Sequence, residues 1–127
     1  MFFVKLALLL VRLQRAIGQT YQLHDAVGSG LIDASPTCTT MFSENVTCPN
    51  TVGLLYTDLF HDFGDNSELT ALCKTSCLES LTLHRNRVKR ACSEARYYDE
   101  YEDTYWLASY PDEFILYAYS IACLKRR

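Results

Sequence analysis

Six cysteines in a chain of 127 residues constrain the fold more than any other feature. Three of them lie in the stretch 72–92, LCKTSCLESLTLHRNRVKRAC. Steps of about one helical turn place these cysteines on one face with mostly apolar residues: Cys73, Cys77, Leu81, His84, Val88 and Cys92. Charged and polar residues lie between them. The pattern predicts an amphipathic helix over about 68–95, with His84 on its core side as a buried or boundary histidine whose hydrogen bonds are satisfied.

The cysteine spacing indicates disulfides rather than a metal site. The sequence has no CxxC pair, and no histidine stands at zinc-like spacing from Cys73 and Cys77. We therefore expect no cofactor and no metal. All six cysteines are predicted to be in disulfides: Cys38, Cys48, Cys73, Cys77, Cys92 and Cys123. Disulfides persist in oxidising compartments, so this prediction requires a secreted chain.

Helix geometry limits how the cysteines can pair. Cys77 and Cys92 are 15 residues apart, which is about 22 Å along a helix axis, whereas a disulfide needs Cα atoms about 4.4–6.8 Å apart. On an unbroken helix Cys92 can therefore pair with neither Cys77 nor Cys73. The working pairing joins Cys92 to Cys123. Cys38 and Cys48 then take the two remaining cysteines in either order, although the sequence alone does not choose among the pairings.

The N-terminus predicts secretion. Residues 1–18 read as a signal peptide, with Lys5 in a short basic region, an apolar core LALLLV over 6–11, and small residues before a cleavage point at Gln19. The expected location is therefore extracellular. An uncleaved helix lying on a membrane surface is the alternative. The apolar core is too short to span a bilayer, which takes about 20 apolar residues, so we expect no stable membrane insertion.

Charge argues against one class of partner. Residues 1–18 carry three basic side chains and no acid, so their removal changes the formal charge from −3 to −6. Proteins that bind nucleic acid need a basic surface for phosphate contacts. We therefore expect no nucleic-acid partner.

The rest of the chain predicts a mainly α fold, a small disulfide-stapled helical domain with a long central helix and a C-terminal helix. Residues 19–37 are small and polar and read as a flexible leader, followed by the cysteine-rich helical domain over 38–127. A short helix is expected over 51–63. The last helix is expected over about 111–124, with Ser109 as its cap and Asp112 three residues later.

Asn45 begins the triplet Asn-Val-Thr, which is an acceptor for N-glycosylation in a secreted protein. The triplet lies in the short segment between Cys38 and Cys48. The sequence therefore predicts a glycoprotein modified at Asn45.

Residues 96–110 are both acidic and aromatic and offer the best candidate binding surface. Aromatic faces stack on sugar rings, and adjacent carboxylates accept hydrogen bonds from hydroxyls. The candidate glycan-binding residues are Tyr97, Tyr98, Trp106 and Tyr110. The alternative is that these rings pack on the helices while the acids only solvate a loop.

No catalytic site is predicted. The paired acids at 99–100 and 102–103 could suggest a glycosidase, but that chemistry needs two carboxyl groups facing each other across a cleft. The sequence has no GxSxG, HExxH or P-loop motif, and oxidised cysteines cannot serve as nucleophiles. We expect a non-enzyme, with a small hydrolase as the less favoured hypothesis.

Three segments carry a resemblance to a known family. They are CTTMFSENVTCP at 38–49, the stretch 72–92 quoted above, and YPDEFILYAYSIACLK at 110–125. Together they resemble the cysteine-rich N-terminal region of fungal secreted LysM-domain proteins. The resemblance implies a fungal, secreted, disulfide-bonded module that typically precedes LysM repeats, which bind chitin or related N-acetylglucosamine polymers.

The 127 residues contain no LysM repeat, so none of the family's chitin-binding residues is carried over. Either the gene product is longer than this sequence, or the chain is a stand-alone secreted relative.

The leading functional hypothesis is a non-enzymatic, effector-like secreted module that acts at the cell wall or the host interface. Its expected partner is chitin or another cell-wall polysaccharide. The alternative is a structural or protein-interaction module with an extracellular protein partner and no glycan affinity.

Overall fold

A computed structural model describes residues 19–25, 30–57 and 66–124 of the chain. The expected signal peptide lies outside these residues, as does the end of the helix expected over 51–63. The elements, in chain order, are β1 (Tyr21–Gln22), β2 (Leu31–Ile32), α2 (Pro36–Phe42), β3 (Asn45–Val46), the 3-10 helix η1 (Asn50–Gly53), α3 (Leu54–Thr57), α4 (Asn66–Leu72), α5 (Thr75–Ala91), β4 (Arg96–Asp99), β5 (Thr104–Leu107) and α6 (Tyr110–Leu124). Helices dominate, but five short strands form two small sheets in this part of the chain, so the mainly α prediction is only partly correct.

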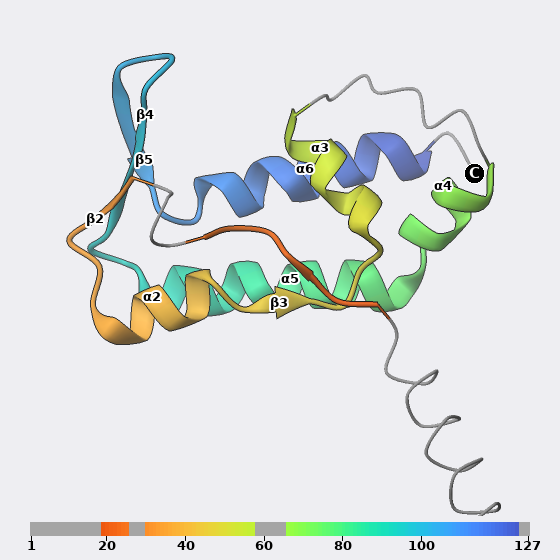
Figure 1. Ribbon diagram of the computed structural model, residues 1–127, viewed down its shortest axis with the longest axis horizontal. Helices are drawn as coiled ribbons and strands as arrows, with labels where there is room; N and C mark the ends of the chain where they lie inside the picture. The colour runs from red at the N-terminus through yellow and green to blue at the C-terminus, as the bar shows by residue number, and fades with distance from the viewer. Residues whose placement is uncertain (1–18, 26–29, 58–65, 125–127) are drawn as a thin grey trace, which may run out of the picture.

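The two longest helices, α5 and α6, form the centre of the domain and run antiparallel (Figure 1). The start of α6 lies beside the middle of α5, where Asp112 bonds to His84. Later in α6, the Tyr119 hydroxyl donates to the Lys74 carbonyl oxygen, just before α5, over 3.2 Å. α5 buries Cys77, Leu81, His84 and Val88, which is the stripe that the sequence predicts.

The central helix expected over 68–95 is interrupted. α4 ends at Leu72 and α5 begins at Thr75, because Lys74 has extended backbone angles (φ −69°, ψ 143°). No glycine or proline marks this break. Instead Leu72 is fully buried and Cys73 is bonded to another element, so tertiary contacts override local helix propensity. The helix also ends earlier than expected, with Cys92 as its C-cap.

All six cysteines are in disulfides, as predicted, but two of the three pairs differ from the working pairing. The structure has Cys38–Cys92, Cys48–Cys77 and Cys73–Cys123. Only Cys48–Cys77 is among the pairs expected.

The expected Cys92–Cys123 pair is wrong because α6 runs antiparallel to α5. Cys123 therefore lies near the start of α5, beside Cys73, rather than near its end. α2 packs along the later part of α5, which brings Cys38 to Cys92. Ser35 fixes the start of α2, because its hydroxyl oxygen accepts from the Cys38 amide over 3.1 Å.

The apolar core has two parts. The larger cluster joins α5 and α6 to the segments from β3 to α4. Its buried members are Val46, Cys48, Val52, Leu55, Leu72, Cys77, Leu81, Ile115, Ala118 and Tyr119. The smaller cluster lies at the other end of α5. Its buried members are Cys38, Phe42, Val88, Cys92, Ala95 and Ala108.

The segment 19–37, expected as a flexible leader, takes part in both sheets. β1 pairs antiparallel with β3, and β2 pairs antiparallel with β4. Gly30 precedes β2 with φ +69° and lies against the Tyr98 backbone, where an added Cβ would come within 3.3 Å of the carbonyl oxygen. A side chain there would be strained, which explains glycine at this turn. No helix in the described residues has the length and apolar character to cross a membrane.

Candidate functional site

The acidic aromatic segment forms the β4–β5 hairpin, which projects from the helices (Figure 1). Tyr97 lies opposite Trp106, and Tyr98 lies opposite Tyr105. Residues directly opposite in an antiparallel pair share a face, and successive residues alternate faces. Tyr97 and Trp106 are therefore on one face of the hairpin, and Tyr98 and Tyr105 are on the other.

Tyr110, at the start of α6, extends the first of these faces. Its ring stacks on Trp106, with ring centroids 4.4 Å apart and an interplanar angle of 12°. Tyr110 is 40% exposed, and Trp106 is half-buried. We call Tyr97, Trp106 and Tyr110 the aromatic face. The indole Nε1 of Trp106 is buried and has no hydrogen-bond partner among the described residues.

Tyr98, the fourth candidate residue, is separated from the other three. Its hydroxyl donates to Asp103 Oδ1 over 2.5 Å, and its ring packs against Tyr105 at 5.1 Å. The hydrogen bond to Asp103 raises the pKa of Tyr98, with burial as a further cause. Tyr98 therefore does not share a face with the other three candidates, because successive side chains of a strand point in opposite directions.

The acids of this segment shape the hairpin turn. Asp99 Oδ1 accepts from the Tyr101 amide over 2.9 Å, and Asp103 has a positive φ of 48°. Tyr101 is fully exposed at the tip. Glycosidase chemistry needs two carboxyl groups that face each other across a cleft. Asp99 and Asp103 instead lie together at one hairpin turn.

A pocket of about 220 Å³ opens next to the aromatic face. Its lining residues are Leu23, His24, Asp25, Phe42, Tyr56, Tyr97 and Pro111. Tyr97 belongs to both the pocket and the aromatic face. Burial, together with the hydrogen bond to Tyr97, raises the pKa of Tyr56, so this phenol stays neutral at physiological pH.

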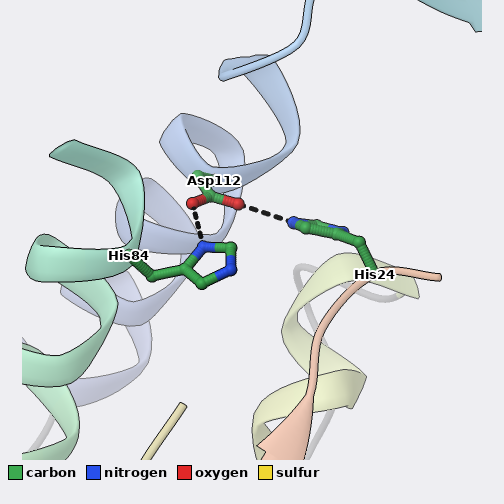
Figure 2. A group of neighbouring side chains, drawn as sticks. All are labelled: His24, His84 and Asp112. Atoms are coloured by element: carbon green, nitrogen blue, oxygen red, sulfur yellow. Dashed lines mark hydrogen bonds and ion pairs between the residues drawn. The ribbon is translucent and has the colours of Figure 1, made fainter. Parts of the chain in front are cut away.

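A buried polar network lies at the edge of this pocket (Figure 2). His24 Nε2 lies 2.6 Å from Asp112 Oδ1, and His84 Nδ1 lies 2.5 Å from Asp112 Oδ2. The side chains of His24, His84 and Asp112 are 8%, 3% and 2% exposed. Burial acts to raise the pKa of Asp112, but the hydrogen bonds from the two histidines outweigh it and the net pKa is lowered. Asp112 is therefore an ionised carboxylate that accepts from both rings.

Three separate elements position the network. His84 lies on α5, one turn from Leu81 and one turn from Val88, which belong to different core clusters. Asp112 lies in the first turn of α6. His24 follows β1 and stacks on Phe42 with ring centroids 4.6 Å apart.

The sequence analysis places His84 correctly in the core but misses its partners. His24 and Asp112 are 88 residues apart, and no motif connects them. The one signal in the sequence is an acid in the first turn of a largely apolar helix. Its position predicts a helix start, which is correct, but it does not reveal that Asp112 is buried against two histidines. His84 Nε2, unlike Nδ1, is buried without a partner in the described part of the chain, so the expectation of a satisfied histidine holds for one nitrogen only.

Asn45, the predicted glycosylation site, is exposed on β3. The amide of Thr47, two residues later, donates to the hydroxyl oxygen of Ser80 over 2.7 Å, which ties this segment to α5. The side chain that would carry the glycan therefore faces solvent from a fixed backbone.

Comparison with known proteins decides the family. Residues 19–127 match the family model described as the secreted LysM effector N-terminal domain. The chain belongs to this family. Its resemblance to the N-terminal region of LysM proteins is thereby confirmed, and the match begins at the residue expected to follow signal-peptide cleavage.

A similar protein from Gibberella moniliformis is named non-secreted LysM effector LCP1. It is 38% identical over 107 residues, which cover 84% of this chain but only 14% of the relative. The chain thus spans about a seventh of that relative's length. The family is described as secreted, whereas this relative is named non-secreted. Secretion of this LysM effector domain therefore stays a prediction. No solved structure matches the chain.

Proposed function

We propose that this LysM effector domain is a secreted, non-catalytic recognition module that acts at the fungal cell wall or the host interface. In this proposal the aromatic face contacts a cell-wall glycan, with chitin as the first candidate. The observation that carries the proposal is the stack of Trp106 on Tyr110 beside Tyr97, on one face of a projecting hairpin. Family membership supports it, because effectors with LysM repeats are associated with chitin-type polymers.

The chemistry of the face suits a sugar. Tyrosine and tryptophan combine an apolar ring face with a polar tip, so they can pack on the C–H face of a sugar ring while hydrogen-bonding its hydroxyls. The adjoining pocket adds polar groups at its rim, namely Tyr56 and Asp25. At about 220 Å³ it is smaller than the ligand pockets of roughly 300–1,000 Å³ that enclose a small molecule. This size favours contact with one unit of a polymer that lies across the surface.

Two observations support the absence of catalysis. Two acids of the hairpin, Asp99 and Asp103, accept hydrogen bonds within the hairpin itself. The six cysteines are all in disulfides, so the chain offers no thiol nucleophile. A screen for turnover on cell-wall glycans tests this part of the proposal. Activity that disappeared on substitution of Glu100 or Glu102 would contradict it.

A protein partner is the second candidate. The exposed side of the hairpin carries large apolar side chains, with Tyr105 62% and Leu107 55% exposed. Exposed aromatic residues are typical of protein interfaces. This reading predicts capture of a specific extracellular protein and no affinity for soluble glycans.

Binding to insoluble chitin, beside cellulose and xylan, separates the two candidates. The glycan proposal predicts saturable chitin binding that Trp106→Ala weakens by about 30-fold or more. Binding of an extracellular protein that depends on Tyr105 or Leu107, without chitin binding, would favour the second candidate.

A further inference from the structure

We infer that His24, His84 and Asp112 form a binding site for a divalent transition-metal ion, with Zn²⁺ as the best match. The site lies at the edge of the pocket that Tyr97 shares with the aromatic face, but the inference does not depend on glycan binding. Two imidazoles and a carboxylate converge there from the segment after β1, from α5 and from α6 (Figure 2).

The donor types select the class of ion. Imidazole nitrogen is a ligand for zinc, copper, iron and nickel, and zinc commonly accepts a carboxylate oxygen beside two histidines. Calcium and magnesium prefer sites built from oxygen donors. The cysteines cannot compete for the ion, because all of them are in disulfides.

The geometry is close to what such an ion needs. One ligand atom from each residue can be chosen so that all three lie within 4.8 Å of one another. Bonds of about 2.0–2.1 Å in a tetrahedral site would space the ligand atoms roughly 3.3 Å apart. The carboxylate oxygens lie 2.6 Å from His24 Nε2 and 2.5 Å from His84 Nδ1, so these pairs would move apart by under about 1 Å around an ion, while the widest-spaced donors, up to 4.8 Å apart, would approach each other by about 1.5 Å.

The proton changes are simple. Asp112 accepts a hydrogen from a ring nitrogen of each histidine, and an ion would take the place of these two hydrogens. Each neutral imidazole then carries its hydrogen on its other nitrogen. For His84 that nitrogen is Nε2, which has no partner in the described part of the chain. No existing hydrogen bond of Nε2 is therefore broken when it takes the proton.

The site also has an entry path. His24 lines the pocket of about 220 Å³, so an ion can reach the network from the surface. Three protein ligands leave a fourth position of zinc for water, and His24 is the ligand that faces the pocket, which Tyr56 also lines. The other two ligands are held by α5 and α6, so most of the site is formed before the ion binds.

The test uses the full, oxidised chain after treatment with EDTA and dialysis. Titration calorimetry with Zn²⁺ should show one ion per chain. His24→Gln keeps a side-chain donor for Asp112 but removes a ligand, so it should weaken zinc binding by more than about 100-fold, beyond the roughly 10–100-fold that loss of an outer-shell partner costs. Glu113→Gln is the control, since it removes an exposed acid of α6 that pairs with Arg85 at the surface, and it should leave the zinc affinity unchanged.

Cobalt substitution provides a readout that needs no variant. Co²⁺ in a four-coordinate site of nitrogen and oxygen ligands gives strong visible absorption, whereas six-coordinate Co²⁺ gives only weak bands. Absence of one-to-one zinc binding, weak six-coordinate cobalt bands, or equal zinc affinity in His24→Gln would each overturn the inference. Trp106→Ala should retain zinc binding, so failure of the metal site and failure of the glycan proposal can be told apart.

Discussion

His84 Nδ1 and Asp112 Oδ2 lie 2.5 Å apart in the interior of the domain and join α5 to the first turn of α6. His24, in the segment after β1, contacts the other carboxylate oxygen of Asp112. The fold thus contains a buried charge that two rings stabilise, between two apolar clusters. This arrangement makes the network a determinant of stability as well as a candidate metal site.

Asp112→Asn should destabilise the metal-free protein by about 1–3 kcal/mol, because the amide nitrogen cannot accept a hydrogen bond and one buried ring N–H therefore loses its acceptor. Glu113→Gln is the control on the same helix. Glu113 is 42% exposed and pairs with Arg85 and Lys89 at the surface, where such pairs contribute about 0–1 kcal/mol. Urea unfolding in EDTA measures both variants. Equal destabilisation by the two substitutions would show that the buried network is not a main source of stability.

The stability that depends on Asp112 should vanish in acid. Its folded pKa is lowered, so the unfolded state binds a proton at a pH where the folded state does not. The contribution is therefore complete above the unfolded value of about 3.9 and is lost as pH falls through the folded pKa. In EDTA, the gap in unfolding free energy between the original chain and Asp112→Asn should narrow as the pH is lowered through the acid range below about 4. A gap that stays constant or widens over this range contradicts the assignment.

Cys73–Cys123 should be the first disulfide to be reduced. Both of its cysteines are partly exposed, whereas Cys38, Cys92, Cys48 and Cys77 are buried. Limited reduction, alkylation and peptide mass mapping identify the order. Complete reduction should strongly lower the melting temperature, since closing loops of this length contributes about 3–4 kcal/mol for each bond. A melting temperature unchanged by reductant, or first cleavage at Cys48–Cys77, would refute this account of the framework.

Asn45 should carry an N-linked glycan when the chain is expressed through a eukaryotic secretory pathway. It is exposed on β3 and followed by the required Thr47. Enzymatic removal of N-glycans should lower the mass of the secreted protein, and Asn45→Gln should abolish that shift. Asn50→Gln serves as control, because Asn50 is exposed but lacks the acceptor triplet. An unmodified secreted protein would disprove the prediction.

The sequence predicts the helices well where periodicity alone decides them. The buried stripe of α5 and the position of α6 follow directly from apolar spacing. The break at Lys74 does not, because no local signal interrupts the pattern and the cause is the position of Cys73 against Cys123. The expected Cys92–Cys123 disulfide is wrong for a similar reason. The antiparallel packing of α5 and α6 depends on tertiary contacts, which the local sequence pattern does not reveal.

The candidate site is predicted only in part. The aromatic residues are identified, but the β4–β5 hairpin is missed because the acids of its turn read as a charged loop. Only the register of the two strands shows that Tyr98 and Trp106 lie on opposite faces of the hairpin, so the sequence alone does not separate them. The buried network is missed because His24 and Asp112 meet only through the folding of distant segments.

The function proposed for the aromatic face is contact with a cell-wall glycan. Its most direct test is the binding isotherm of the oxidised chain on insoluble chitin, for the original chain, Trp106→Ala and Tyr105→Ala. Saturable binding is expected, and Trp106→Ala should weaken it by about 2 kcal/mol or more, which is roughly 30-fold. Tyr105→Ala, on the opposite face, should bind as the original chain does. Absence of saturable binding, or equal loss in both variants, would contradict the claim.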